Sequence, residues 1–130
     1  MLAEASATIR TRGWSGCSTS WRGRVDHDDA LNHITGSMGT GDLGILTEGR
    51  RGMIHQEWNP TDGPARAFIL VYPNEPLAPG AAFDAVRDDE ATRVTEAEGV
   101  ITKQVAKRGD GRLHGEVTSS PTACWTPAPT

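Results

Sequence analysis

Apolar residues occur along this chain in short runs that turn residues separate. The clearest runs lie near residues 44–48, Met53–Trp58, 66–72 and 100–106, and the stretches "GRRG", "NPTDGP" and "KRGDGR" divide them. Few windows keep a helical period over eleven residues, and fifteen glycines and eight prolines interrupt the rest. The pattern predicts an all-β domain built from many short strands.

Two of the longer stretches give more specific expectations. "ARAFILVYP" is the most apolar run, so we expect it to form a central strand. Residues 73–99 are too many for a hairpin loop, so we expect them to cover one edge of the sheet, with a short helical turn around residues 88–93.

Composition and charge limit the classes of protein that this chain fits. The 130 residues suffice for one domain with a modest core, since 36% are hydrophobic. The net charge of −4 argues against a direct nucleic-acid partner, and the basic start of the chain is interpreted as solvated surface rather than a binding patch. Its members are Arg10, Arg12, Arg22 and Arg24.

The hydrophobicity of the first residues and the two cysteines bear on the cellular location of the protein. The start has no apolar run of signal-peptide or membrane-span length, so we expect a cytoplasmic protein that does not enter a membrane. Cys17 and Cys124 are then expected to be two thiols in a reducing compartment, with a disulfide as the alternative.

The glycine-rich stretch "GTGDLG" at residues 39–44 fits the glycine spacing of a dinucleotide-binding loop. A strand-like run follows it, so no helix N-terminus would face a pyrophosphate. We interpret it as a turn that Asp42 holds. No phosphate-loop motif or GxSxG nucleophile motif occurs elsewhere in the sequence.

Histidines supply the candidate chemistry. His27 lies among carboxylates in "VDHDDA", which suits either a divalent cation or a solvated loop, and the solvated loop is favoured. His33 and His114 carry no spacing signal. His55 and Glu57 are two apart in "GMIHQEWN", so on a strand both side chains project from the same face. An imidazole and a carboxylate suit iron, nickel or a similar divalent ion, although a usable site needs at least three protein donors.

The residues around that pair resemble the pirin family of the cupin superfamily. The family's core contains H-x-D, then G-D-v, then T-A-G-R, and closes with a strand ending in H-x-E. The stretch "HDDALNHITGSMGTGDLGILTEGRRGMIHQEWN" presents the same order, with one extra residue near Arg50 and Arg51. "ARAFILVYP", "EGVITKQVAKRGDGRLHGEV" and, upstream, "RGWSGCSTSWRGRVDHDD" continue the similarity over most of the chain.

The resemblance implies a double-stranded β-helix, the cupin barrel, around a metal that is most often iron. It places His55 and Glu57 among the metal ligands and gives the carboxylate of Glu57 a role in proton transfer during catalysis. The two other family histidines fall on Ile9 and Thr11, which cannot replace imidazole. Family members are quercetin dioxygenases in bacteria and iron-dependent regulators of transcription factors in animals.

Both ends of the chain depart from the family pattern. We therefore expect a degenerate or poorly ordered segment over residues 1–22, a pirin-like cupin domain over 23–118, and a disordered tail over 119–130. Either the chain is a diverged single cupin, or both ends are reading-frame artefacts around an authentic core, and the second is favoured slightly. Pirins have about twice this length, so a lone barrel would expose surface that a homodimer contact could cover.

The expected function is that of a metal-dependent dioxygenase acting on a small phenolic, flavonol-like substrate such as quercetin, with an incomplete metal site. The alternatives are a non-catalytic cupin that binds or regulates a partner, and an inactive fragment.

Overall fold

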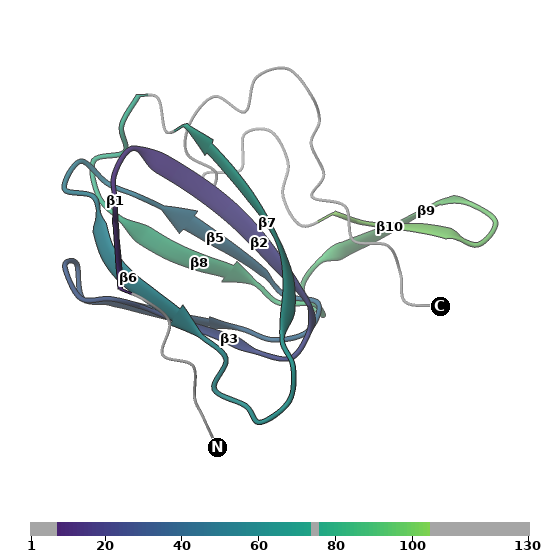
Figure 1. Cartoon of the computed structure of the whole chain (residues 1–130). Coiled ribbons are helices and arrows are strands. Elements are labelled where there is room, and N and C mark those ends of the chain that lie inside the picture. The colour runs from purple at the N-terminus through teal and green to yellow at the C-terminus, as the bar shows by residue number, and fades with distance from the viewer. Residues whose placement is uncertain (1–7, 74–75, 105–130) are drawn as a thin grey trace.

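The computed structural model describes residues 8–73 and 76–104, and this part of the chain is all strand and turn (Figure 1). None of the described residues belong to a helix long and apolar enough to cross a membrane. His114, Cys124 and the expected tail lie outside these ranges, and the domain boundaries at residues 23 and 118 stay predictions. The ten strands are β1 (Ile9–Thr11), β2 (Trp14–Arg22), β3 (Val25–Asp29), β4 (Ile34–Met38), β5 (Leu43–Thr47), β6 (Met53–Trp58), β7 (Arg66–Pro73), β8 (Ala82–Val86), β9 (Thr92–Ala97) and β10 (Val100–Gln104).

Eight of the strands form two antiparallel sheets that lie one over the other (Figure 1). The first sheet has the order β1-β6-β3-β4 and the second has the order β7-β2-β5-β8. β9 and β10 form a separate hairpin that projects from one end of the pair of sheets. The predicted all-β class is confirmed, and so are the strands expected near residues 44–48, Met53–Trp58, 66–72 and 100–106 as far as the described residues reach.

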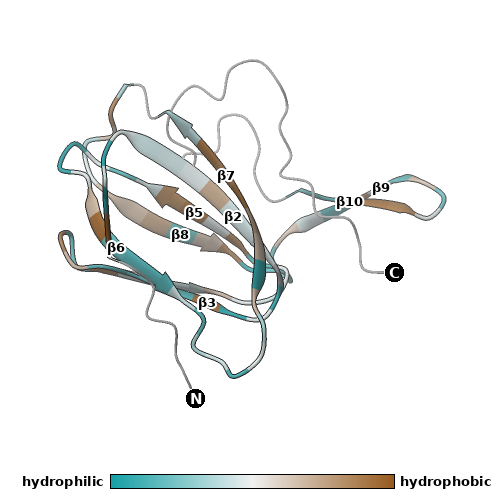
Figure 2. Ribbon diagram, viewed as in Figure 1, coloured by the Kyte–Doolittle hydropathy of each residue, from teal (hydrophilic) through white to brown (hydrophobic). Residues whose placement is uncertain are grey.

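The most apolar strand is at an edge of its sheet, so the prediction of a central strand is wrong. β7 pairs only with β2 among the described strands. Figure 2 shows the apolar colouring along this edge strand. Phe68, Ile69 and Val71 are 53%, 56% and 56% exposed. Hydrophobicity makes burial favourable, but the pairing order decides which strand has a neighbour on each side.

β2 occupies the central place instead, although the sequence around it suggested a degenerate segment. It pairs with β5 through Ser15 to Thr19 and with β7 along almost its whole length. A strand between two neighbours satisfies its backbone groups whatever its side chains are, so small residues such as Gly16 and Ser18 are tolerated there. Most of residues 8–22 thus lie in β1 and β2.

The long connection after β7 adds one strand to the sheet and one to the hairpin. β8 pairs with β5, which agrees with the expectation that this stretch covers an edge. The helical turn expected near residue 88 is a single turn, closed by a hydrogen bond from Glu90 N to Arg87 O (3.1 Å). β9 begins two residues later, at Thr92.

A buried apolar cluster lies on one face of the second sheet. Cys17 is the ladder partner of Ile45, and Leu43 is the partner of Val86, so these side chains share a face. Leu43 and Ile45 are 1% and 0% exposed. Burying a side chain of this size contributes about 1.5–3 kcal/mol. The opposite face of β2 and β5, which carries Gly16 and Leu46, looks toward the cavity described below.

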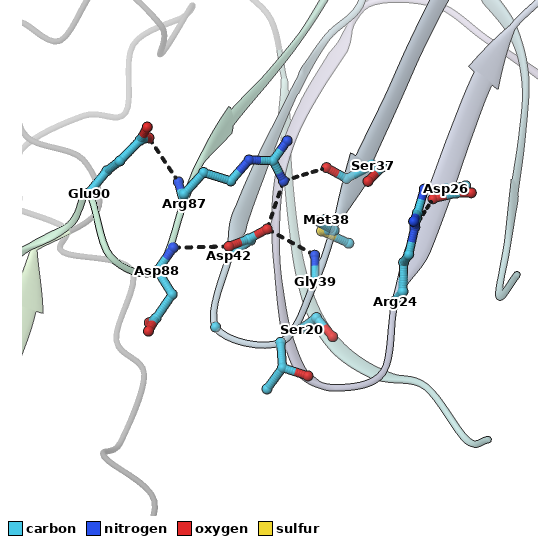
Figure 3. A network of polar contacts seen from close by, with 12 residues as sticks. Ser20, Arg24, Asp26, Ser37, Met38, Gly39, Asp42, Arg87, Asp88 and Glu90 are labelled. Atoms are coloured by element: carbon cyan, nitrogen blue, oxygen red, sulfur yellow. Dashed lines mark hydrogen bonds and ion pairs between the residues drawn. The ribbon is translucent and has the colours of Figure 1, made fainter. Parts of the chain in front are cut away.

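The glycine-rich turn before β5 is held by Asp42, as predicted (Figure 3). Asp42 Oδ2 accepts hydrogen bonds from Gly39 N (2.9 Å) and Arg87 Nη1 (2.7 Å), and its Oδ1 accepts one from Asp88 N (2.9 Å). Gly41 has a φ of 86°, which favours glycine, and a Cβ there would lie 2.7 Å from the Asp88 carboxyl carbon. These contacts join the turn before β5 to the end of β8.

Candidate functional site

The candidate site begins on β6, which carries His55 and Glu57. They are two residues apart on a regular strand, so both side chains leave the same face, as the sequence predicted. Both residues are partly buried, and both line a cavity between the two sheets. The Glu57 side chain is 37% exposed.

The strands on either side of β6 determine which residues accompany this pair. On β1, Ile9 is the direct ladder partner of His55. On β3, Asp29 is opposite His55 and His27 is opposite Glu57. Directly opposed residues of an antiparallel ladder project from the same face. His27, His55 and Glu57 are therefore brought together from positions that are almost thirty residues apart in the chain.

His27 is a buried neighbour of the pair rather than a solvated loop residue, so the favoured interpretation of "VDHDDA" was wrong for it. It is 2% exposed, and its Nδ1 lies 3.6 Å from Glu57 Oε1. Its ring meets the His55 ring edge-on at 5.2 Å between centroids and stacks on Phe83 at 5.1 Å. Neither ring nitrogen of His27 has a hydrogen-bond partner among the described residues. Gly36, opposite His27 on β4, leaves the room that the Phe83 ring fills.

Asp29 is also buried, but both oxygens of its carboxylate accept hydrogen bonds from within the protein. Its Oδ1 accepts hydrogen bonds from Leu31 N (3.0 Å) and Ile54 N (3.1 Å), and its Oδ2 accepts one from Asn32 Nδ2. Burial acts to raise the pKa of Asp29, but these hydrogen bonds outweigh it and hold the pKa below its usual value. Asp29 thus closes the turn between β3 and β4. Asp26 points to the other face and pairs with Arg24 (2.7 Å). The acidic residues around His27 therefore lie on opposite faces of the strand.

The cavity has a volume of about 400 Å³, within the range of small-molecule sites. Its wall is mainly apolar or small, and its polar groups are few. Thr11 Oγ1 and His55 Nδ1 are buried lining atoms without a hydrogen-bond partner among the described residues. The lining residues are Ile9, Thr11, Trp14, Ser15, Gly16, Cys17, Ser18, Leu46, Glu48, His55, Glu57, Ile69 and Val71.

The charge state of Glu57 follows from its surroundings. The contact with His27 lowers the pKa of Glu57, burial acts in the opposite direction, and the charges of His27 and His55 lower it further. The net pKa is below the usual value for a glutamate, so this side chain is a carboxylate at neutral pH. A carboxylate in a largely apolar cavity is a strong hydrogen-bond acceptor for a ligand.

The described residues do not fit a complete metal centre of the kind the resemblance implies. No set of three or more His, Cys, Asp or Glu side chains in the described ranges is arranged to hold a metal ion. Ile9 and Thr11 do line the same cavity as His55 and Glu57, so the strand positions expected for two further ligands are there. Their side chains are not metal donors of the required kind, because isoleucine has no donor atom and a threonine hydroxyl is weak. The assignment of iron, and of His55 and Glu57 as its ligands, stays a prediction.

The structure places Glu48, which sequence reasoning did not single out, in the lining of the cavity. Glu48 follows β5 and is 4% exposed, and its Oε2 accepts a hydrogen bond from Trp14 N (3.0 Å). The position of Glu48 at the end of an apolar run gave no signal of its own. His27 did carry a signal, since Val25, His27 and Asp29 alternate as one face of a strand would. His33, by contrast, lies in the turn before β4 with a φ of 57° and is not among the residues that line the cavity.

Comparisons with known proteins agree with the fold. No protein-family model and no curated protein sequence matches the chain. Among solved structures, it is similar to quercetin 2,3-dioxygenase from Acinetobacter baumannii, with a TM-score of 0.69 and 17% identity over 91% of this chain and 43% of that one. A protein from Geobacillus kaustophilus gives a TM-score of 0.70 and 17% identity over 92% of this chain and 47% of that one.

A third neighbour is a complex with a metal ion. The bacterial pirin YhhW from Escherichia coli, in complex with nickel(II), has a TM-score of 0.54 and 18% identity over 64% of this chain and 35% of that one. The chain spans less than half the length of each of these three proteins. The resemblance seen in the sequence is confirmed at the level of architecture: the chain has the all-β cupin fold of the pirins.

Proposed function

We propose that this chain is a small-molecule-binding cupin whose cavity takes a phenolic ligand and does so without a tightly held metal. One observation supports this proposal. A largely apolar cavity of about 400 Å³ contains two convergent polar side chains, His55 and Glu57, while the two further ligand positions carry Ile9 and Thr11. An apolar pocket with a few well-placed polar groups is the usual form of a small-molecule site.

A phenol suits both parts of this cavity. Its ring would lie against apolar lining such as Leu46 and Val71, and its hydroxyl would donate a hydrogen bond to the Glu57 carboxylate. The contact with His27 holds Glu57 in its ionised form, in which it accepts hydrogen bonds but does not donate them. The similarity in fold to a quercetin 2,3-dioxygenase supports a flavonol-sized phenol as the ligand class.

Titration calorimetry with quercetin on chelator-treated protein tests the proposal. We expect binding to persist without metal, and Glu57→Gln to weaken it about 10-fold or more, since a hydrogen bond to a charged acceptor contributes roughly 1.5–3 kcal/mol. Glu98→Gln is the matched control, because it removes the same charge from an exposed residue between β9 and β10. Loss of all quercetin binding in the chelated protein would contradict the proposal.

A metal-dependent dioxygenase is the second candidate, favoured by the pair His55 and Glu57 on one face of a strand. It predicts that purified protein holds iron or nickel in stoichiometric amount and that His55→Ala removes it. It also predicts oxygen uptake with quercetin. Metal analysis by mass spectrometry therefore separates the two candidates directly.

A further inference from the structure

The most exposed part of the cavity lining is apolar. Ile9, Trp14, Ile69 and Val71 line the cavity and are 51%, 47%, 56% and 56% exposed, whereas the other lining residues are buried or half-buried. We call these four residues the apolar mouth. Apolar side chains at the entrance of a cavity favour contact with an apolar group over contact with water.

The apolar mouth lies on the side where the two sheets are open. β4 and β8 contact each other at one side of the pair of sheets. β1 and β7 are the outer strands at the opposite ends of the two strand orders. β1 carries Ile9, and β7 carries Ile69 and Val71. The cavity therefore reaches the surface between these two outer strands.

Small residues on β2 connect the apolar mouth to the interior of the cavity. Gly16 lies between Leu46 on β5 and Val71 on β7, and Ser18 lies beside Ile69. Gly16 has no side chain and Ser18 has a short one, so a hollow crosses β2 from Leu46 to the edge of the sheet. Adjacent strands are about 4.8 Å apart, so this hollow spans roughly 10 Å, enough for an aromatic ring followed by a short alkyl chain.

The polar groups of the cavity lie on the facing sheet. His55 and Glu57 are on β6, the strand next to β1. Both line the same cavity as the apolar mouth, so a ligand whose hydroxyl reaches this pair can extend its other end into the mouth. This arrangement fits an amphipathic ligand with one polar end and one apolar end.

We propose that the cavity binds phenols that carry an apolar tail, with the ring inside the cavity and the tail in the apolar mouth. The inference rests on the proposed function and goes beyond it by naming the class of phenol. Ile69 and Val71 would lie along one side of the tail and Ile9 along the other. Each methylene group that leaves water should raise the affinity about 3- to 4-fold.

A series of phenols that differ only in tail length tests this inference. The probes are 4-methylphenol, 4-ethylphenol, 4-propylphenol and 4-butylphenol, and each is titrated against bound quercetin on chelator-treated protein. We expect the affinity to rise about 3-fold for each added methylene, which amounts to about 30-fold over the series. An affinity that stays within about 2-fold over the series would overturn the inference, and so would failure of all four to displace quercetin.

A double variant of the mouth links the effect of tail length to the residues on β7. Ile69→Thr, Val71→Thr keeps β-branched side chains on the strand but adds hydroxyl groups to the mouth. We expect the gain to fall below about 2-fold for each methylene, while the affinity for 4-methylphenol changes by less than about 2-fold. Val94→Thr, Ile101→Thr is the matched control, since it makes the same two changes at exposed positions of the hairpin, and it should leave the gain unchanged.

Circular dichroism establishes that the variants are folded, and Ile9→Thr replaces the double variant if that one is not. An unchanged gain in the folded mouth variant overturns the inference. A second copy of the chain is the alternative occupant of the mouth, and sedimentation velocity detects it: a dimer that Ile69→Thr, Val71→Thr dissociates would also overturn the inference. If quercetin itself does not bind, the proposed function fails, whereas quercetin binding with no effect of tail length contradicts this inference alone.

Discussion

Two buried polar side chains, Asp42 and His27, differ in whether the described part of the chain provides their hydrogen-bond partners. The Asp42 carboxylate accepts three hydrogen bonds from Gly39, Arg87 and Asp88 (Figure 3). His27 is more deeply buried, but its two ring nitrogens have no hydrogen-bond partner among the described residues, and its Nδ1 lies 3.6 Å from Glu57 Oε1. Both residues lie in segments that drew attention in the sequence.

The difference separates structural polar groups from functional ones. A buried polar group that the chain itself satisfies stabilises the fold, as Asp42 does for the turn before β5. A buried polar group left unsatisfied beside a cavity costs free energy in the isolated protein, which a ligand or a function compensates. This criterion favours the corner where His27 and His55 lie beside Glu57 as the candidate site over the glycine-rich turn.

The largest expected effect comes from restoring histidines at the two positions that lack metal donors. In the double variant Ile9→His, Thr11→His, four donors would face the cavity, because Ile9 is opposite His55 in the ladder. We expect affinity for Ni²⁺ to rise by about 100-fold or more, since even changes outside the ligand shell commonly alter metal affinity 10–100-fold. Titration calorimetry with NiCl₂ measures it.

Arg10→His is the matched control for this experiment. It places a histidine on the same short strand, but alternation directs it to the opposite face. Equal nickel affinity in the control would show that the β1 register does not bring Ile9 and Thr11 to the cavity.

An intermediate effect is expected when Asp42, whose carboxylate accepts three hydrogen bonds, loses its charge. Asp42→Asn should lower the free energy of unfolding by about 2 kcal/mol, because Asp42 loses its ion pair with Arg87 and part of its hydrogen bonding. Burial acts to raise the pKa of Asp42, but hydrogen bonds from Gly39 N, Arg87 and Asp88 N outweigh it, so the folded pKa lies below the usual value.

The sign of the pH dependence follows from that lowered pKa. The stabilisation by Asp42 is fully present above its unfolded pKa of about 3.9 and is lost as pH falls through the folded pKa. Urea unfolding at pH 7 and pH 3 should therefore show a smaller difference between the natural protein and Asp42→Asn at pH 3. Asp62→Asn, in an exposed loop, should change stability by less than about 0.5 kcal/mol at either pH.

The smallest expected effect on stability comes from the unsatisfied histidine. His27→Leu removes two buried ring nitrogens that have no hydrogen-bond partner among the described residues, so the gain in desolvation offsets the lost stacking on Phe83. We expect the free energy of unfolding to stay within about 1 kcal/mol, and the pKa of Glu57 to rise toward its usual value as its main stabilising contact disappears. Urea unfolding and carboxyl NMR titration measure the two changes.

Asp29→Leu is the contrasting variant on the same strand and the same face. It leaves three hydrogen-bond donors without their acceptor, so it should cost about 3 kcal/mol or more. If His27→Leu proves as destabilising as Asp29→Leu, the distinction between satisfied and unsatisfied groups does not hold in this protein.

Much of the site's composition was available in the sequence. The alternation of "MIHQEW" predicted a strand with His55 and Glu57 on one face, because local periodicity is a property of adjacent positions. The cupin fold and the positions of Ile9 and Thr11 were implied by the resemblance to the pirin family. The exposed edge at β7 was predicted as a central strand, because apolarity along a run says nothing about which strands pair with it.

The sequence by itself determined the all-β class, the turn that Asp42 holds and the shared face of His55 and Glu57, since each depends on residues a few positions apart. Only the tertiary structure decided that His27 lies against Glu57, that Glu48 lines the same cavity, and that β2 is central while β7 is an edge. The reason is that ladder register sets the distance between residues of different strands. Register depends on how the whole sheet buries its surface rather than on any one segment.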